Sequence, residues 1–409
     1  MNKSVIAASV ALLGSTSAIA QTQQVVKPPI AQYWMSVETA AGMGGMGSGG
    51  VASMMSGMMG GPGAGGRRML LQLASQNSSS APQAEHDIPP GLNMGPALPL
   101  THQVKPRPEP REDGLPQDRE VKGRMLIYWG CGDEVRKGQP VVIDFSKVAA
   151  GQTPPNLVSR RINAPRPPSP GRAKGYGEWP NTLPDGSKAV PNDASLRGEH
   201  VVKANYAPEI KFSLGETHDF MQPVALSSQG NRVMWSSVPN ATGYFATAYG
   251  AASQDEFVMW SSSEQQEMGG MLMTFVPPAE VARLVKEKIV MPSSATECKV
   301  PGEVVQKAGG NPFVNFIAYG PEANFVQPPR PADPKIPWEQ QWVAKARFKS
   351  TGSILLGMEE RSQGRSRARS PGQEPQAQQP QQQQSQPATP GVPDPVQEGV
   401  KALRGIFGR

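Results

Sequence analysis

The sequence predicts a mainly β protein with two β-sandwich-like domains, the second of which contains one inserted helix. Apolar and polar residues alternate in several short segments, as in 208–214, where Ile210, Phe212 and Leu214 would share one face of a strand. Glycine and proline are abundant, with 44 and 43 residues among 409, which favours turns between short strands over a helical bundle. The net charge of +6 is mild for this length, so no dedicated nucleic-acid-binding groove is expected.

Residues 1–20 have the layout of a secretory signal peptide. Lys3 precedes a mostly apolar run over 5–13, and Ala18 and Ala20 supply the small residues of a cleavage site. The apolar run is too short to span a bilayer. We therefore expect an exported protein of the periplasm or outer membrane, or a secreted one.

The first predicted β domain covers residues 21–214. Segments rich in β-branched, aromatic or alternating residues predict strands over 33–39, 68–73, 123–129, 139–145 and 208–214. Two proline-rich stretches, 82–117 and 154–192, are expected to run as extended connections over the surface. The second of them is basic and aromatic, with Arg160, Arg161, Arg166, Arg172, Lys174, Tyr176 and Trp179. It could contact a polyanion or a glycan, or it could be a solvated loop.

A loop rich in methionine and glycine lies between the first two predicted strands, over residues 41–66. Glycine at this density prevents a stable helix. Methionine sulfur is a soft ligand for Cu(I), and the spacing supports a copper-binding hypothesis beside the alternative of a flexible hairpin loop. The methionines are Met43, Met46, Met54, Met55, Met58 and Met59.

The clearest folding signal is the stretch 231–264, which predicts three short strands separated by turns. The segment 232–236 is rich in β-branched and aromatic residues. Pro239, Asn240 and Gly243 supply turn chemistry before a strand that begins at Tyr244. A third strand is predicted over 257–260.

This stretch resembles the B–C region of fibronectin type III-like sandwiches. The residues that carry the resemblance are Trp235, Val238, Ala241, Gly243 and Tyr244. The match covers about twenty residues and implies a fold without implying an activity. We therefore predict a fibronectin type III-like β domain over 215–358.

The rest of this second domain contains one predicted helix and four further predicted strands. The helix spans 277–288, because prolines suit a helix start and Val281, Leu284 and Val285 share one face. The strands are predicted over 271–276, 315–319, 342–348 and 354–356.

The C-terminal region has a different composition. Residues 359–393 are rich in arginine, glutamine and proline, which predicts a disordered linker. Residues 394–409 form a short amphipathic segment with Lys401, Arg404 and Arg409, and this segment either contacts a membrane surface or partner or is a frayed terminus.

Two cysteines follow the export signal, Cys131 and Cys298. An even count in an exported protein favours one disulfide, which would link the two predicted domains. No Cys-x-x-Cys pair supports zinc or redox chemistry.

Catalytic motifs are sparse. Glu216, His218 and Asp219 form the one cluster of acid and base groups around which a hydrolase could be argued, and a turn is the alternative. We therefore predict a non-catalytic envelope binding or scaffolding protein without a cofactor, whose partner is an envelope protein, a glycan or an anionic surface. The alternatives are an exported hydrolase acting on an envelope polymer, and a copper-binding periplasmic protein.

Overall fold

The computed structural model describes residues 24–42, 66–102, 123–180 and 190–357, except residues 153, 155, 159 and 254. The predictions for the signal peptide, for most of the Met/Gly loop and for the C-terminal region from residue 359 lie outside these residues. Strands dominate the described part, which confirms a mainly β protein with several sheets. None of its helices is long and apolar enough to cross a membrane.

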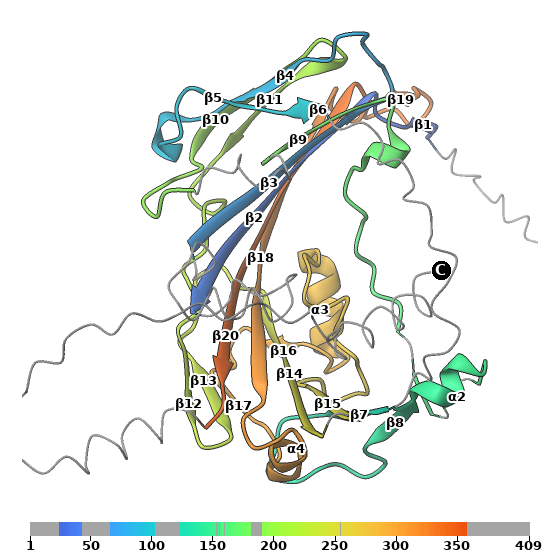
Figure 1. Ribbon diagram of the computed structural model, residues 1–409. Helices are drawn as coiled ribbons and strands as arrows, with labels where there is room; N and C mark the ends of the chain where they lie inside the picture. The colour runs from blue at the N-terminus through green and yellow to red at the C-terminus, as the bar shows by residue number, and fades with distance from the viewer. Residues whose placement is uncertain are drawn as a thin grey trace, which may run out of the picture.

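One large mixed sheet of eleven strands runs through the molecule (Figure 1). Short β16 (Met291–Pro292) pairs with β14 beside the main path. Along that path the strands are β6 (Thr101–His102), β9 (Gly175–Trp179), β3 (Gly66–Ser75), β2 (Ala31–Gly42), β20 (Trp342–Leu355), β18 (Phe313–Gln327), β14 (Gly243–Ser253), β15 (Glu256–Ser261), β7 (Arg124–Trp129) and β8 (Val141–Asp144).

Two smaller sheets pack against this sheet and bury the main core. At one end lies a four-stranded sheet of β11 (Ala207–Leu214), β10 (Gly198–Ala204), β4 (Ala84–Asp87) and β5 (Ala97–Pro99) (Figure 1). At the other end lies a three-stranded sheet of β12 (Leu226–Gln229), β13 (Arg232–Trp235) and β17 (Glu297–Lys299). The ring centroids of Trp235 on β13 and Phe316 on β18 are 4.6 Å apart across the second interface. A two-stranded pair of β1 (Val26–Lys27) and β19 (Trp338–Glu339) completes the described sheets.

The large sheet takes strands from both predicted domain ranges. β2 pairs in parallel with β20, and β7 pairs in parallel with β15. The predicted boundary near residue 215 therefore does not separate the sheets, because strands distant in sequence join across it. β20 also unites the two strands predicted over 342–348 and 354–356.

The predicted helix is confirmed as α3 (Pro278–Lys286). Two short helices were not predicted, α2 (Phe145–Ala149) and α4 (Gly302–Lys307). The strand predicted over 271–276 is wrong: the amides of Leu272 and Met273 both donate to the carbonyl of Gly269, which closes a turn. Gly269 has a φ of +76°, a conformation that starts such a turn and interrupts a strand.

The proline-rich stretches contain more structure than predicted. Residues 82–102 include β4, β5 and β6, and short 3₁₀ turns occupy Pro90–Leu92 and Pro170–Arg172. β9 follows the basic run, and its Tyr176 and Trp179 are only 3% and 6% exposed. These two rings belong to the packed interior, so the interpretation in which they contact a glycan beside the basic run is wrong.

Candidate functional site

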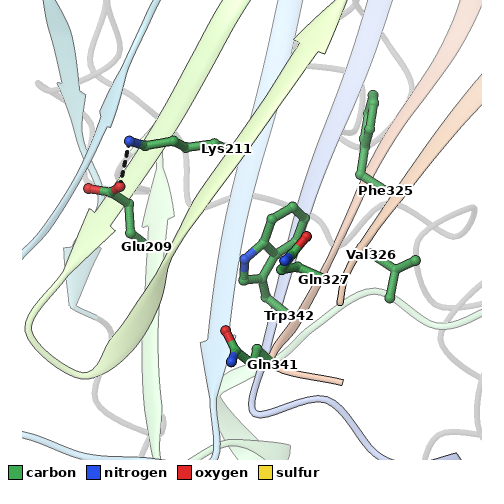
Figure 2. Close-up of a pocket in the computed structure, with 7 residues that line it drawn as sticks. All are labelled: Glu209, Lys211, Phe325, Val326, Gln327, Gln341 and Trp342. Carbon is green, nitrogen blue, oxygen red and sulfur yellow. Dashed lines mark ion pairs between the residues drawn. The ribbon is translucent and has the colours of Figure 1, made fainter. Parts of the chain in front are cut away.

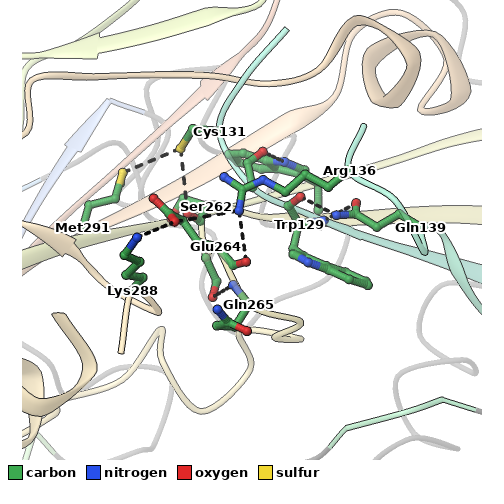
Figure 3. Close-up of polar contacts among 12 residues, drawn as sticks. Trp129, Cys131, Arg136, Gln139, Ser262, Glu264, Gln265, Lys288 and Met291 are labelled. Carbon is green, nitrogen blue, oxygen red and sulfur yellow. Dashed lines mark hydrogen bonds and ion pairs between the residues drawn. The ribbon is translucent and has the colours of Figure 1, made fainter. Parts of the chain in front are cut away.

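The predicted disulfide between Cys131 and Cys298 is present, with a Cα–Cα distance of 5.3 Å. It joins the connection after β7 to β17 in the three-stranded sheet. Figure 3 shows the surroundings of Cys131, where Arg136 Nη1 donates to the carbonyl of Glu264 over 3.1 Å. The Gln139 side chain also exchanges two hydrogen bonds of 2.9 Å with the backbone of Trp129. The bridge and its neighbours therefore fix the end of β7.

The cluster of Glu216, His218 and Asp219 is not assembled as a catalytic site. The Asp219 carboxylate accepts hydrogen bonds from the amide of Leu196 at 2.9 Å and the hydroxyl of Ser195 at 2.7 Å. Partial burial alone would raise the pKa of Asp219, but these hydrogen bonds lower it. The Glu216 side chain is 88% exposed, and His218 is hydrogen-bonded to the neighbouring Thr217. Asp219 thus holds a turn. The Arg197 guanidinium lies 3.2 Å from the Asp219 carboxylate and 3.8 Å from that of Glu216, so the two carboxylates share a structural ion pair.

Metal binding has no obvious centre in the part of the chain that the structure describes, where no three His, Cys, Asp or Glu side chains gather as metal ligands. Most of the Met/Gly loop proposed for copper lies outside this part.

A pocket of about 460 Å³ lies between β11, β18 and β20. This volume falls within the range of about 300–1,000 Å³ that is usual for ligand sites. Figure 2 shows Trp342 between the Glu209–Lys211 ion pair and Phe325. The Lys211 ammonium and Glu209 carboxylate are 2.8 Å apart. The complete lining is Glu209, Lys211, Phe325, Val326, Gln327, Gln341 and Trp342.

The pocket lies beside two open strand edges. β18 pairs with β20 along nearly its whole length, but it pairs with β14 only over residues 313–319. Within the described residues, 320–327 therefore have no strand neighbour on the second side. In the described part of the chain, β11 is likewise an end strand that pairs only with β10. Open edges present backbone donors and acceptors that can pair with an added strand.

A buried aromatic cluster lies behind the pocket. The ring of Phe325 is 5.0 Å from that of Phe212, and Phe212 stacks on His200 with a centroid distance of 5.0 Å and an interplanar angle of 4°. His86 and Tyr33 continue the cluster, and all three polar residues are at most 1% exposed. The pocket wall is thus continuous with the polar centre of this core.

Hydrogen bonds in this cluster fix the position of each proton. His200 Nε2 lies 2.7 Å from the carbonyl of Leu196, which can only accept, so Nε2 carries the proton. Neutral His200 then accepts at Nδ1 from His86 Nε2 over 3.0 Å. His86 accepts in turn at Nδ1, and the Tyr33 hydroxyl donates to it over 2.8 Å.

Burial lowers the pKa of both histidines, and in His86 the neighbouring His200 lowers it further. Burial also raises the pKa of Tyr33. All three groups are therefore neutral in the folded protein at pH 7, and we call Tyr33, His86 and His200 the buried relay.

Comparisons of the chain with protein-family models, with curated proteins and with solved structures found no match. The fold and the site together define a class, a layered β protein with a pocket between open sheet edges.

Sequence reasoning missed the pocket and the buried relay. The pocket draws on residues from 209 to 342, and the relay histidines are 114 positions apart. A local signal existed only in the strand patterns, which placed Phe212 and Trp342 on strands without indicating what those strands face.

Proposed function

We propose that this chain is an exported, non-catalytic binding or scaffolding protein of the cell envelope that holds an extended polypeptide segment of an envelope partner. The segment would add as a strand to the open edge of β18 at residues 322–327, between Pro321 and Pro328. The observation that carries the proposal is this open edge next to the pocket. The sequence pattern of an export signal supports the location.

The chemistry of the pocket suits such a ligand. In β-strand addition, main-chain hydrogen bonds supply affinity, and pockets for alternate side chains supply specificity. Trp342 and Phe325 would receive an apolar side chain, while the Glu209–Lys211 pair at the other wall would contact polar groups of the bound segment.

The predicted domain over residues 215–358 would form a fibronectin type III-like sandwich, as the motif around Trp235 and Tyr244 suggests. Support comes from the strand orders β12-β13-β17 and β15-β14-β18-β20 in two layers that share one core. The long strands β18 and β20 would continue from this sandwich into a second one closed by the four-stranded sheet.

The test is selection of peptides from a random display library on the purified mature protein, followed by affinity measurements with synthetic peptides. Val326 lines the pocket on the open edge, and a lysine on an edge strand blocks strand addition. We expect Val326→Lys to weaken the selected peptides at least about tenfold, a loss of roughly 1.4 kcal/mol.

The matched control is Val142→Lys, because Val142 is 39% exposed on β8, another edge strand. This variant should bind like the original protein. Failure to enrich any peptide, or equal binding by the Val326→Lys variant, would contradict the proposal.

A further inference from the structure

The face of the large sheet opposite the two small sheets carries a row of cations and aromatic rings. Tyr33, Met35 and Val37 of β2 belong to the main core, so Trp34, Ser36 and Glu38 project to the opposite face. On the neighbouring β20 they pair in register with three cationic residues, Lys345, Arg347 and Lys349. Phe275, from the segment that precedes α3, lies against Arg347 and Lys349.

The Arg347 guanidinium lies at the centre of this row. The central guanidinium carbon, Cζ, is 4.7 Å from the ring centre of Trp34 and 4.4 Å from the ring centre of Phe275. Nε donates to the Ser36 hydroxyl over 2.8 Å. No other hydrogen bond from this guanidinium is made to the described residues, so its terminal N–H groups remain available.

The two flanking lysines differ from Arg347 in one respect, because each has its own carboxylate. Lys345 forms an ion pair with Glu322. The Lys349 ammonium nitrogen lies 3.4 Å from a carboxylate oxygen of Glu38. Within the described ranges, no carboxylate is in ion-pairing distance of Arg347. Burial lowers the pKa of Arg347 to about 10, and the charge of the more distant Glu322 opposes this shift in part.

A largely buried cation without a carboxylate in contact is unfavourable, because the more distant Glu322 offsets only part of its desolvation. The stacked rings recover part of this free energy. The remaining N–H donors form a planar fork that matches two oxygens of one anion. Such a group is poised to bind an oxyanion. Because each flanking lysine is paired with a carboxylate, Arg347 supplies the positive charge that would attract the anion.

We propose that Arg347, flanked by Lys345 and Lys349 and held by Trp34, Phe275 and Ser36, is a binding site for a single oxyanion of a soluble ligand. This site is separate from the pocket and does not depend on the proposed strand addition. The group that would bind there is an exposed carboxylate or phosphate of the ligand, as found on acidic metabolites and polymer subunits.

The test is calorimetric titration of the mature full-length chain with inorganic phosphate and with acetate, at constant ionic strength maintained with sodium chloride. We expect at least one of these anions to bind and to raise the thermal midpoint of unfolding. Arg347→Met should weaken that binding at least about tenfold while the protein stays folded, because methionine removes the charge and keeps an apolar contact with the rings.

The matched control is Arg330→Met, because Arg330 also lies over an aromatic ring, at 5.7 Å from Trp338, away from this row. It should bind the anion as the original protein does. A further variant, Arg347→Lys, keeps the charge and cannot form the fork, and should also lose about tenfold in affinity. The inference fails if neither anion binds, if Arg347→Met and Arg347→Lys both bind normally, or if Arg330→Met loses as much.

Discussion

At the scale of single residues, the buried relay shows how fully the interior of this protein is specified. Each ring nitrogen of His86 and His200 has one partner, and the chain of donors has one direction, from Tyr33 to the carbonyl of Leu196. A buried acceptor that loses its donor destabilises the fold by about 1–3 kcal/mol. The Tyr33 hydroxyl is therefore the group whose removal best tests the assigned direction.

We predict that Tyr33→Phe lowers the free energy of unfolding by about 1–3 kcal/mol, because His86 Nδ1 is left without a donor. Urea denaturation at pH 7.5 measures the change. The control is Tyr206→Phe: Tyr206 is 3% exposed, and its buried hydroxyl has no hydrogen-bond partner among the described residues, so its loss should be neutral or stabilising. Equal destabilisation by the two variants would show that the hydroxyl of Tyr33 is not a required donor.

At the scale of elements, the disulfide joins the connection after β7 to β17, beside a backbone hydrogen bond from Gly132 to the carbonyl of Lys299. The connection after β7 leaves the edge region of the large sheet, and β17 lies in the three-stranded sheet, 167 positions later in sequence. Constraint of so long a loop in the unfolded chain stabilises the fold by roughly 5 kcal/mol in the chain-entropy model, and measured values are often smaller. The bridge thus holds the two layers of this end together.

We predict that Cys131→Ala combined with Cys298→Ala lowers the free energy of unfolding by about 2–5 kcal/mol. The midpoint of urea denaturation should shift to a lower urea concentration. Chemical reduction of the original protein should produce a similar shift. A variant with an unchanged midpoint would contradict the predicted role of the bridge.

At the scale of the whole molecule, the four-stranded sheet closes over the large sheet around groups that must stay neutral. The histidines of the relay have a lowered pKa in the folded protein, whereas in the unfolded chain they titrate near 6.5. The unfolded state therefore binds more protons below this pH. The stability contribution of the neutral histidines is complete above pH 6.5 and is lost progressively as the pH falls below it.

We predict that the free energy of unfolding falls between pH 6.5 and 5, by up to about 2.7 kcal/mol per pH unit if both histidines contribute. Denaturation midpoints across this range measure the slope, and nitrogen NMR of the imidazole rings reports their state. Both rings should stay neutral and protonated at Nε2 in the folded protein at pH 6. Imidazolium signals at that pH without unfolding would contradict the prediction.

Much of this architecture was predictable from local pattern. Alternation in 208–214 predicted β11, and the prolines and apolar spacing in 277–288 predicted α3. An even number of cysteines after a predicted export signal predicted the bridge. These features depend on residues close in sequence, or on a count, and so they are visible without a fold.

Only the tertiary structure decided which strands meet. The pairing of β2 with β20 joins residues about 311 positions apart and brings Arg347 beside Trp34 and Ser36. Likewise, packing of one sheet on another brings His86 to His200 and Phe325 to Phe212. Strand pairing depends on backbone hydrogen bonds that every residue type except proline can form in full, so a single sequence carries little record of its partner. For that reason the sequence determined the elements and the bridge, while the pocket, the buried relay and the surroundings of Arg347 arose from the way the sheets close.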